Sequence, residues 1–222
     1  MTGSSYHHGR LREALVEEAI AAARERGPAG LGLRELARRV GVSHNAAYRH
    51  FADREDLVAE VAAHAMEQLV TAMRVRLGEV DEVAEAEPVL RARLRLAAVG
   101  RAYVEFALTE PGLFRVAFTA DPEGAVAGAM LTEGPYLLLC QVLDEMVEVG
   151  FLAPQAREGA DVTCWSLVHG FSVLNLDGPL AGAPPAARAA ALEQLLLAVD
   201  RSYAASTGRG DTLPRQALRL SP

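Results

Sequence analysis

The chain has 222 residues, of which 50% are hydrophobic, and it carries a net charge of −7. This length allows one large domain or two small ones, and the hydrophobic share excludes a chain that is disordered throughout. The negative average hides an uneven distribution: residues 1–57 hold nine arginines against eight acidic residues, whereas residues 58–222 hold 13 against 21. A weakly basic first quarter of the chain followed by an acidic remainder suits a protein that binds phosphate groups with one end only.

The sequence contains two cysteines, Cys140 and Cys164, and both lie in apolar stretches. This position indicates buried free thiols, because a disulfide framework or a zinc site needs more cysteines at closer spacing. No run of 18 apolar residues predicts a membrane-spanning helix, and the first residues lack the apolar core of a signal peptide. We therefore expect a soluble cytoplasmic protein without a membrane contact, a metal site or a cofactor.

The first part of the chain predicts four helices in succession. The first covers about residues 9–26 and ends at a Gly-Pro pair. The second covers residues 33–40, where apolar side chains recur at i, i+3, i+4 and i+7. Ser43 is a good N-cap for a third helix that continues to about Phe51, and Asp53 begins a fourth.

An acidic stretch at residues 78–87 is expected to form a loop after the fourth helix. Beyond it the sequence predicts five more helices, over residues 88–108, 111–118, 136–149, 154–176 and 185–203. The first of these is apolar on two sides, which predicts a central position in a helical bundle. The pattern between residues 121 and 134 does not define a helix, and residues 206–222 are expected to form a flexible tail. Because no segment alternates with period two, the predicted fold class is all-α, with about nine helices.

A tight turn at residues 41–43 joins the second and third helices, which is the pattern of a helix-turn-helix. Gly41 supplies the positive φ angle that such a turn requires. If the apolar Ala47 and Phe51 face inward, the outward face is left to His44, Asn45 and Tyr48. Imidazole, amide and phenol groups on one helix face suit the major groove of DNA, where asparagine pairs bidentately with adenine. The alternative is an ordinary solvated helix.

The run from Gly9 to about Val61 resembles the DNA-binding domain of the TetR family of one-component regulators. An arginine-bearing helix comes first, followed in order and spacing by four short motifs: LRELA at 33–37, GVS at 41–43, YRHF at 48–51 and DREDL at 53–57. Gly32 and Ala47 depart from the family pattern, since relatives often have Ser or Thr at the first position and a larger apolar residue or Pro at the second.

The resemblance implies a DNA-binding domain over residues 1–57 that reads DNA with its third helix. It implies base reading by His44, Asn45 and Ala46. It implies phosphate contacts by Tyr48, His50 and Arg54. We count Ser43 and Arg34 among the candidate DNA-binding residues as well. Phosphate contacts fix the register on the duplex and base contacts specify its sequence, so the two groups differ in their consequences.

Residues 58–205 are expected to form a larger helical domain for ligand sensing and dimerisation. Its stretch WSLVHG at 165–170 resembles the Trp-x3-His-Gly signature of one TetR C-terminal subgroup, as do residues 101–107 and 111–114. Trp165 and His169 share a helix face, where they either pack the core or line a pocket in which His169 offers a polar contact. The candidate pocket residues are Tyr103, Phe106, Phe114, Phe118, Met130, Tyr136, Cys140, Trp165 and His169.

By the same resemblance, the last helices are expected to form a dimer interface through Leu192, Leu195, Leu196 and Val199. The predicted function is that of a homodimeric repressor that binds double-stranded DNA at a palindromic operator and is released by a small-molecule effector. A ligand-aided activator, a helical enzyme, and a regulator that keeps the fold but binds protein are the alternatives. The sequence contains no nucleophile elbow, phosphate-binding glycine loop or zinc-ligand spacing, so no catalytic residue is assigned.

Overall fold

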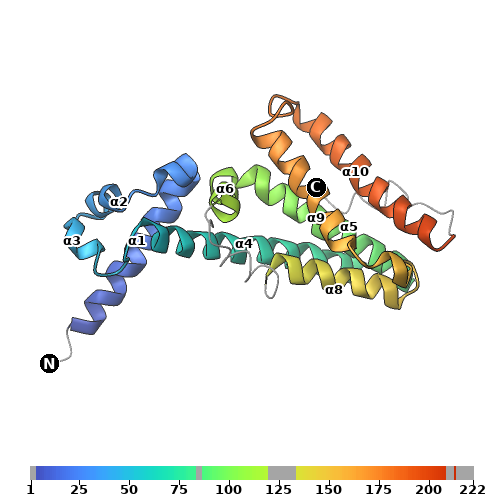
Figure 1. Cartoon of the computed structure of the whole chain (residues 1–222), viewed down its shortest axis with the longest axis horizontal. Coiled ribbons are helices and arrows are strands. Elements are labelled where there is room, and N and C mark those ends of the chain that lie inside the picture. The colour runs from blue at the N-terminus through green and yellow to red at the C-terminus, as the bar shows by residue number, and fades with distance from the viewer. Residues whose placement is uncertain (1–3, 84–86, 120–133, 209–212, 214–222) are drawn as a thin grey trace. The chain divides into compact units, whose positions relative to one another are not determined.

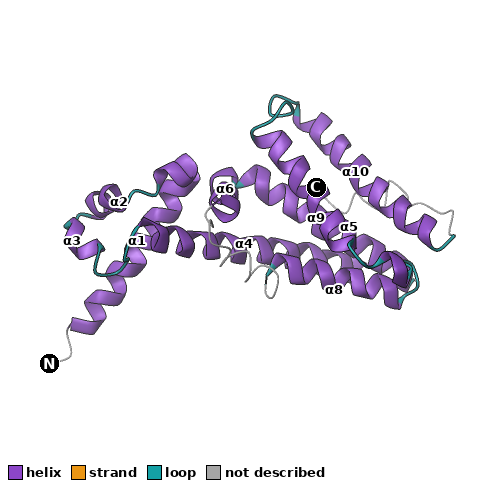
Figure 2. Cartoon of the chain, viewed as in Figure 1, coloured by secondary structure: helices purple, strands orange, loops and turns teal. Residues whose placement is uncertain are grey.

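The computed structural model describes residues 4–83, 87–119, 134–208 and 213. Within these ranges the chain forms nine α-helices, two short 3-10 helices and no strand (Figure 2), which confirms the predicted all-α class. None of the described helices is long and apolar enough to cross a membrane. The α-helices, labelled in Figure 1, are α1 (Ser4–Arg26), α2 (Leu33–Val40), α3 (His44–Ala47), α4 (Arg54–Val83), α5 (Pro88–Thr109), α6 (Pro111–Thr119), α8 (Pro135–Glu148), α9 (Ala160–Leu176) and α10 (Pro185–Ser206).

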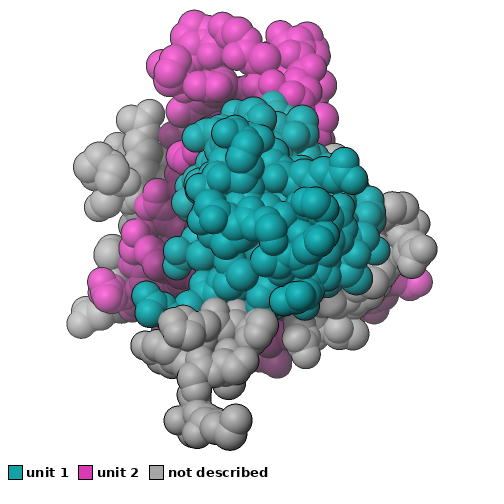
Figure 3. All heavy atoms as spheres, turned by 90° about the vertical axis from the view of Figure 1, so that its left-hand side faces the viewer, with its two compact units in different colours: residues 1–68, 110–129 teal, residues 69–109, 130–222 magenta. Residues whose placement is uncertain are grey.

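The chain packs as two compact units, which Figure 3 shows in different colours. Unit 1 comprises residues 1–68 and 110–129, and unit 2 comprises residues 69–109 and 130–222. Helix α6 belongs to unit 1 because it packs against α1 and the 3-10 helix η1 (Gly27–Gly30). This division by packing differs from the functional boundary expected after residue 57, which stays a prediction.

Unit 1 contains the predicted helix-turn-helix. Helix α2 ends at Gly41, whose φ of 78° is left-handed, and the Val42 N–H donates to the Ala37 carbonyl at 2.9 Å. Ser43 caps α3 by accepting the Ala46 N–H at 3.3 Å. The α-helical part of α3 is shorter than the expected range of residues 43–51. The N–H groups of residues 49 and 50 bond to carbonyls three residues back, which tightens the chain into turns.

Helix α4 continues to Val83, so the loop expected at residues 78–87 was wrong over residues 78–83. Gly78 lies within this helix, is exposed, and would accept a Cβ with no atom within 4 Å. Two acidic residues of the stretch form ion pairs: Arg76 bonds to Glu79 at 2.8 Å, and Arg95 of α5 bonds to Asp81. Acidic composition in this stretch therefore reflects a solvated helix face.

Helix α5 is the central helix of unit 2, as its two apolar faces predict. It packs against α8, α9 and α10. The single helix expected at 154–176 is instead a 3-10 helix, η2 (Pro154–Ala156), followed by α9. Gly159, with a φ of 74°, separates the two. Leu213, expected in a flexible tail, is buried in unit 2, where its N–H donates to Asp200 at 3.0 Å.

Candidate nucleic-acid interface and internal cavity

The start of α3 presents polar side chains to solvent. Ser43, His44 and Asn45 are exposed, Ala46 is half-buried, and the Tyr48 side chain just after the helix is 44% exposed. Ala47 and Phe51 face the core of unit 1, as the helical spacing predicts. An imidazole, an amide and a phenol therefore share one solvent-facing surface. Their contact with DNA stays a prediction at this point.

The segment that carries α3 is anchored at its end by Phe51. Phe51 is 1% exposed, and the guanidinium of Arg12 in α1 lies 5.2 Å from the centre of its ring. Arg12 also donates two hydrogen bonds, of 2.9 and 2.8 Å, to the carboxylate of Glu60 in α4. A guanidinium held by a carboxylate over a buried ring fixes α1, α4 and the end of the turn together. The surface of α3 is thereby preorganised.

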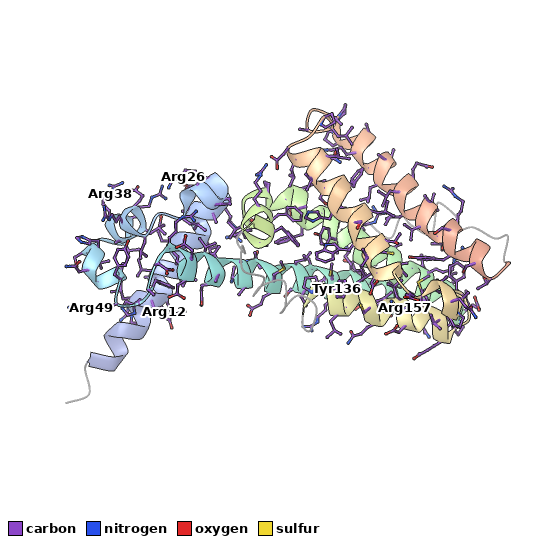
Figure 4. The ribbon with its side chains drawn as sticks, viewed as in Figure 1. Arg12, Arg26, Arg38, Arg49, Tyr136 and Arg157 are labelled. Atoms are coloured by element: carbon purple, nitrogen blue, oxygen red, sulfur yellow. The ribbon has the colours of Figure 1, made fainter. Side chains whose placement is uncertain are left out.

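The arginines of unit 1 fall into ion-paired and available groups; Arg38 of the first group and Arg49 of the second are labelled in Figure 4. Arg38 and Arg39 both donate to Glu35, and these hydrogen bonds hold the pKa of Glu35 at about 2. Arg34 and Arg49, in contrast, are exposed and form no ion pair with any residue that the structure describes. A cation without an internal counter-ion is more readily used for phosphate binding.

Two further candidates, His50 and Arg54, lie close to the same turn. His50 is half-buried, and Arg54 donates from Nη2 to the Pro28 carbonyl at 2.7 Å while its Nη1 lies 4.0 Å from Glu55. The Arg54 side chain is thus positioned by η1. The sequence prediction omitted Arg49, although it stands inside the YRHF motif. Its availability depends on the absence of a nearby carboxylate, which a local motif does not show.

Unit 2 contains a cavity that opens to solvent, and the cavity together with its opening holds about 720 Å³ of space free of protein atoms. Helices α4, α5, α8, α9 and α10 supply its lining, which is largely aliphatic. The aromatic and polar lining residues are Tyr103, Tyr136, Trp165, Cys164, Arg93 and Asp200. Concave apolar sites with a few polar groups are typical of small-molecule binding.

Three of the nine residues expected in a pocket, namely Tyr103, Tyr136 and Trp165, line this cavity. Phe114 and Phe118 lie in unit 1, where they pack on each other with ring centres 4.7 Å apart, and neither lines this cavity. Phe106 is buried, and Cys140 points its sulfur to Asp161 at 3.8 Å; neither lines the cavity. Met130 lies outside the described residues. Helical periodicity groups residues on a face but does not tell which neighbour covers it.

His169 does not line the cavity, but it is hydrogen-bonded to Tyr103, which does. Its Nδ1 lies 2.8 Å from the Tyr103 hydroxyl, which also accepts the indole N–H of Trp165 at 3.2 Å. Burial raises the pKa of Tyr103 and lowers the pKa of His169. A neutral phenol that accepts from the indole and donates to Nδ1 satisfies both contacts. The motif residues Trp165 and His169 are therefore joined through Tyr103.

A buried ion pair between Arg93 and Asp200 forms another part of the cavity lining. Arg93 donates from Nε and Nη2 to the two carboxylate oxygens of Asp200 at 2.9 and 2.8 Å, and both side chains are 5% exposed. The guanidinium of Arg93 also lies 4.4 Å from the centre of the Phe151 ring. The sequence prediction did not find this pair, since 107 residues separate its members.

The four residues expected at a dimer interface lie on the inner face of α10. Leu192, Leu196 and Val199 are buried, and Leu195, Leu196 and Val199 line the cavity. This differs from the expectation, because that face of α10 packs toward α5 and α9. Several large apolar side chains on and just after α9 are exposed instead: Val162, Leu167, Val173, Leu174 and Leu180.

An all-helical chain with an exposed, anchored helix-turn-helix and a separate helical unit defines the class of helix-turn-helix transcriptional regulators. The model of bacterial regulatory proteins of the tetR family matches residues 15–61, and the tetracyclin repressor-like C-terminal domain matches residues 96–199. The chain belongs to the TetR family of DNA-binding transcriptional regulators.

The chain is also similar to individual known proteins. The chain is 23% identical over 168 residues to the uncharacterized HTH-type transcriptional regulator YobS of Bacillus subtilis (strain 168), covering 75% of this chain and 79% of that protein. A solved structure of a protein with unknown function from Rhodococcus sp. RHA1 is 29% identical, with a TM-score of 0.69 over 93% of this chain and all of that one. The structure of RolR in complex with resorcinol shares the fold at 15% identity, with a TM-score of 0.60 over 97% and 95% of the two chains.

Proposed function

We propose that the chain is a homodimeric repressor that binds a palindromic operator through α3 and releases it when a small molecule occupies the cavity of unit 2. The observation that carries the proposal is the exposed polar surface of α3 on an anchored turn. His44, Asn45 and Ala46 read base edges in the major groove, where the amide of Asn45 suits adenine. The small Ala46 permits close approach to the bases.

Phosphate contacts come from the residues around α3. The Ser43 hydroxyl accepts the Ala46 N–H, so its own proton is available to a phosphate oxygen. Tyr48, His50, Arg34 and Arg54 extend this surface, and Arg49 joins them because it is exposed and belongs to no internal ion pair among the described residues. These contacts fix the register in which Asn45 meets its base.

The proposed effector site is supported by the aliphatic and aromatic lining of the cavity in unit 2. A protein of the same fold, RolR, has been solved with the ligand resorcinol. Release of DNA requires that the effector bind one conformation of the dimer more tightly than the other, and its effect is bounded by that difference.

The experiment that tests DNA binding is selection of duplexes from a random library by the intact chain. We expect enrichment of one sequence with two-fold symmetry, whose half-sites lie about one helical turn (~34 Å) apart, as two copies of a recognition helix require. A library that shows no enrichment over repeated rounds would exclude operator recognition. A promoter fusion carrying the selected site then tests repression, because an activator raises its expression and a repressor lowers it.

Arg49→Gln should weaken binding to all duplexes similarly and reduce the salt dependence of binding. Each lost phosphate contact lowers the slope of log affinity against log salt by about 0.9, and a dimer loses about twice that. The measurement is a titration of the selected duplex at several salt concentrations. Arg38→Gln is the matched control, since Arg38 is already paired with Glu35, and it should change the slope less. Equal slopes for the wild type and Arg49→Gln would contradict the phosphate contact.

The dimer contact is proposed on the outer face of α9 and α10. Leu167, Val173 and Leu174 are exposed on α9, and α10 adds exposed alanines that permit close helix approach.

Leu174→Arg should raise the dimer dissociation constant at least about tenfold, measured by sedimentation equilibrium, because it places a charge in an apolar contact. Leu137→Arg on α8 is the control, since Leu137 has a similar exposure, 38% against 44%. Unchanged dimerisation of Leu174→Arg would exclude this face.

A further inference from the structure

The cavity of unit 2 contains two opposite charges that neutralise each other. Among its described lining residues, Arg93 and Asp200 are the charged side chains, and they bond to each other through two hydrogen bonds. The other titratable lining groups are neutral near pH 7. Burial raises the pKa of the Tyr103 phenol and of the Cys164 thiol, and the hydrogen bond to Asp161 raises the pKa of Tyr136 to about 12.

We propose that the Arg93–Asp200 pair restricts this cavity to uncharged, largely apolar ligands such as alcohols and phenols, and excludes carboxylates and amines of the same size. The inference rests on the proposed effector site. An ion that enters an apolar cavity loses its hydration and needs a counter-charge there. Both charges of the lining are already engaged, so an ionised ligand finds none.

An anionic ligand that uses Arg93 as its counter-charge would compete with Asp200 for the guanidinium. Asp200 is held by more than the guanidinium, because its Oδ2 also accepts the Leu213 N–H at 3.0 Å. Separation of the pair would leave a carboxylate without its cation at a site that is 5% exposed, which is strongly unfavourable. The same reasoning applies to a cationic ligand that competes for Asp200. A neutral ligand leaves the pair intact.

The single tryptophan of the sequence, Trp165, lines the cavity, so its fluorescence reports occupancy directly. The probes are two matched pairs that do not absorb where tryptophan does: cyclohexanol with cyclohexanecarboxylate, and menthol with menthanecarboxylate. Each is titrated into the full chain at neutral pH. We expect the alcohols to change the emission saturably and to bind at least about tenfold more tightly than the carboxylates. This comparison uses the wild-type chain and depends on no variant.

Two variants then test whether carboxylates are excluded because Asp200 neutralises Arg93. Asp200→Asn leaves the charge of Arg93 without its carboxylate, so carboxylate binding should improve about tenfold or more relative to the alcohol. The double variant Arg93→Gln/Asp200→Asn carries no charge and should keep the preference for alcohols.

Two outcomes overturn the proposal in distinguishable ways. If the wild type binds carboxylates as tightly as alcohols, or if Asp200→Asn keeps the wild-type preference, the pair does not set selectivity, although the cavity remains an effector site. If no probe changes the emission of the wild type, the cavity does not take such molecules, and the effector site fails together with the inference. DNA selection by the intact chain is unaffected by either result.

Discussion

Arg93→Met should lower the free energy of unfolding of unit 2 by about 3–5 kcal/mol, because it leaves the buried carboxyl group of Asp200 without its cation. Asp200 accepts two hydrogen bonds from Arg93 and is 5% exposed, so water does not replace the lost partner. The substitution also removes the guanidinium that lies over the Phe151 ring. Urea unfolding followed by the emission of Trp165, which lies in the same unit, measures this change directly.

The double variant Arg93→Met/Asp200→Leu is the control for that prediction. Replacing both members of a buried ion pair by apolar residues of similar volume is often neutral or stabilising. We therefore expect the double variant to recover most of the stability that Arg93→Met loses. If Arg93→Met alone unfolds at the same urea concentration as the wild type, the pair is hydrated in solution. The claim that Arg93 and Asp200 form a buried ion pair in the cavity lining would then be incorrect.

Gly112→Ala should destabilise unit 1 by about 3 kcal/mol or more, because α6 approaches α1 backbone to backbone at this glycine. A Cβ at position 112 would lie 2.0 Å from the Ala23 carbonyl oxygen and 3.0 Å from the Arg24 Cα. No rotamer relieves a contact between backbone atoms, so the two helices must separate. The measurement is hydrogen exchange of the α1 and α6 amides, which should accelerate relative to the wild type.

Gly78→Ala is the matched control for the second prediction. Gly78 lies within α4 and is exposed, and a Cβ added there would have no neighbouring atom within 4 Å. Alanine there should stabilise the helix by about 0.5–1 kcal/mol, because glycine loses more backbone entropy. Equal exchange rates in Gly112→Ala and Gly78→Ala would show that α6 does not pack closely on α1.

The helix-turn-helix was predictable because its signals are local. Gly41 supplies the left-handed turn, Ser43 caps α3, and Ala47 and Phe51 alternate with exposed positions at helical spacing. Each signal lies within a few residues of the structure that it determines. The same reasoning failed at residues 78–83, where Arg95 of α5 pairs with Asp81 and an apparent acidic loop is a helix.

The cavity was less accessible to sequence reasoning because its parts are distant in the chain. The Arg93–Asp200 pair joins α5 to α10, and neither residue stands in a recognisable motif. The leucines of α10 were expected at a dimer contact by family resemblance. Their apolar stripe could not decide this, because such a stripe has the same appearance whether a neighbouring helix or a second chain covers it. Leu196, which lines the cavity, is an example.

The most direct test of operator reading by α3 is the base preference of Asn45→Ala on the selected duplex. Each position of the half-site is substituted by the other three bases, and binding is compared with that of the wild type. We predict that Asn45→Ala costs about 1–3 kcal/mol and loses discrimination at one position of each half-site, whereas the exposed-amide control Gln141→Ala on α8 changes neither. Full affinity and unchanged discrimination at every position in Asn45→Ala would contradict the assignment of α3 to the major groove.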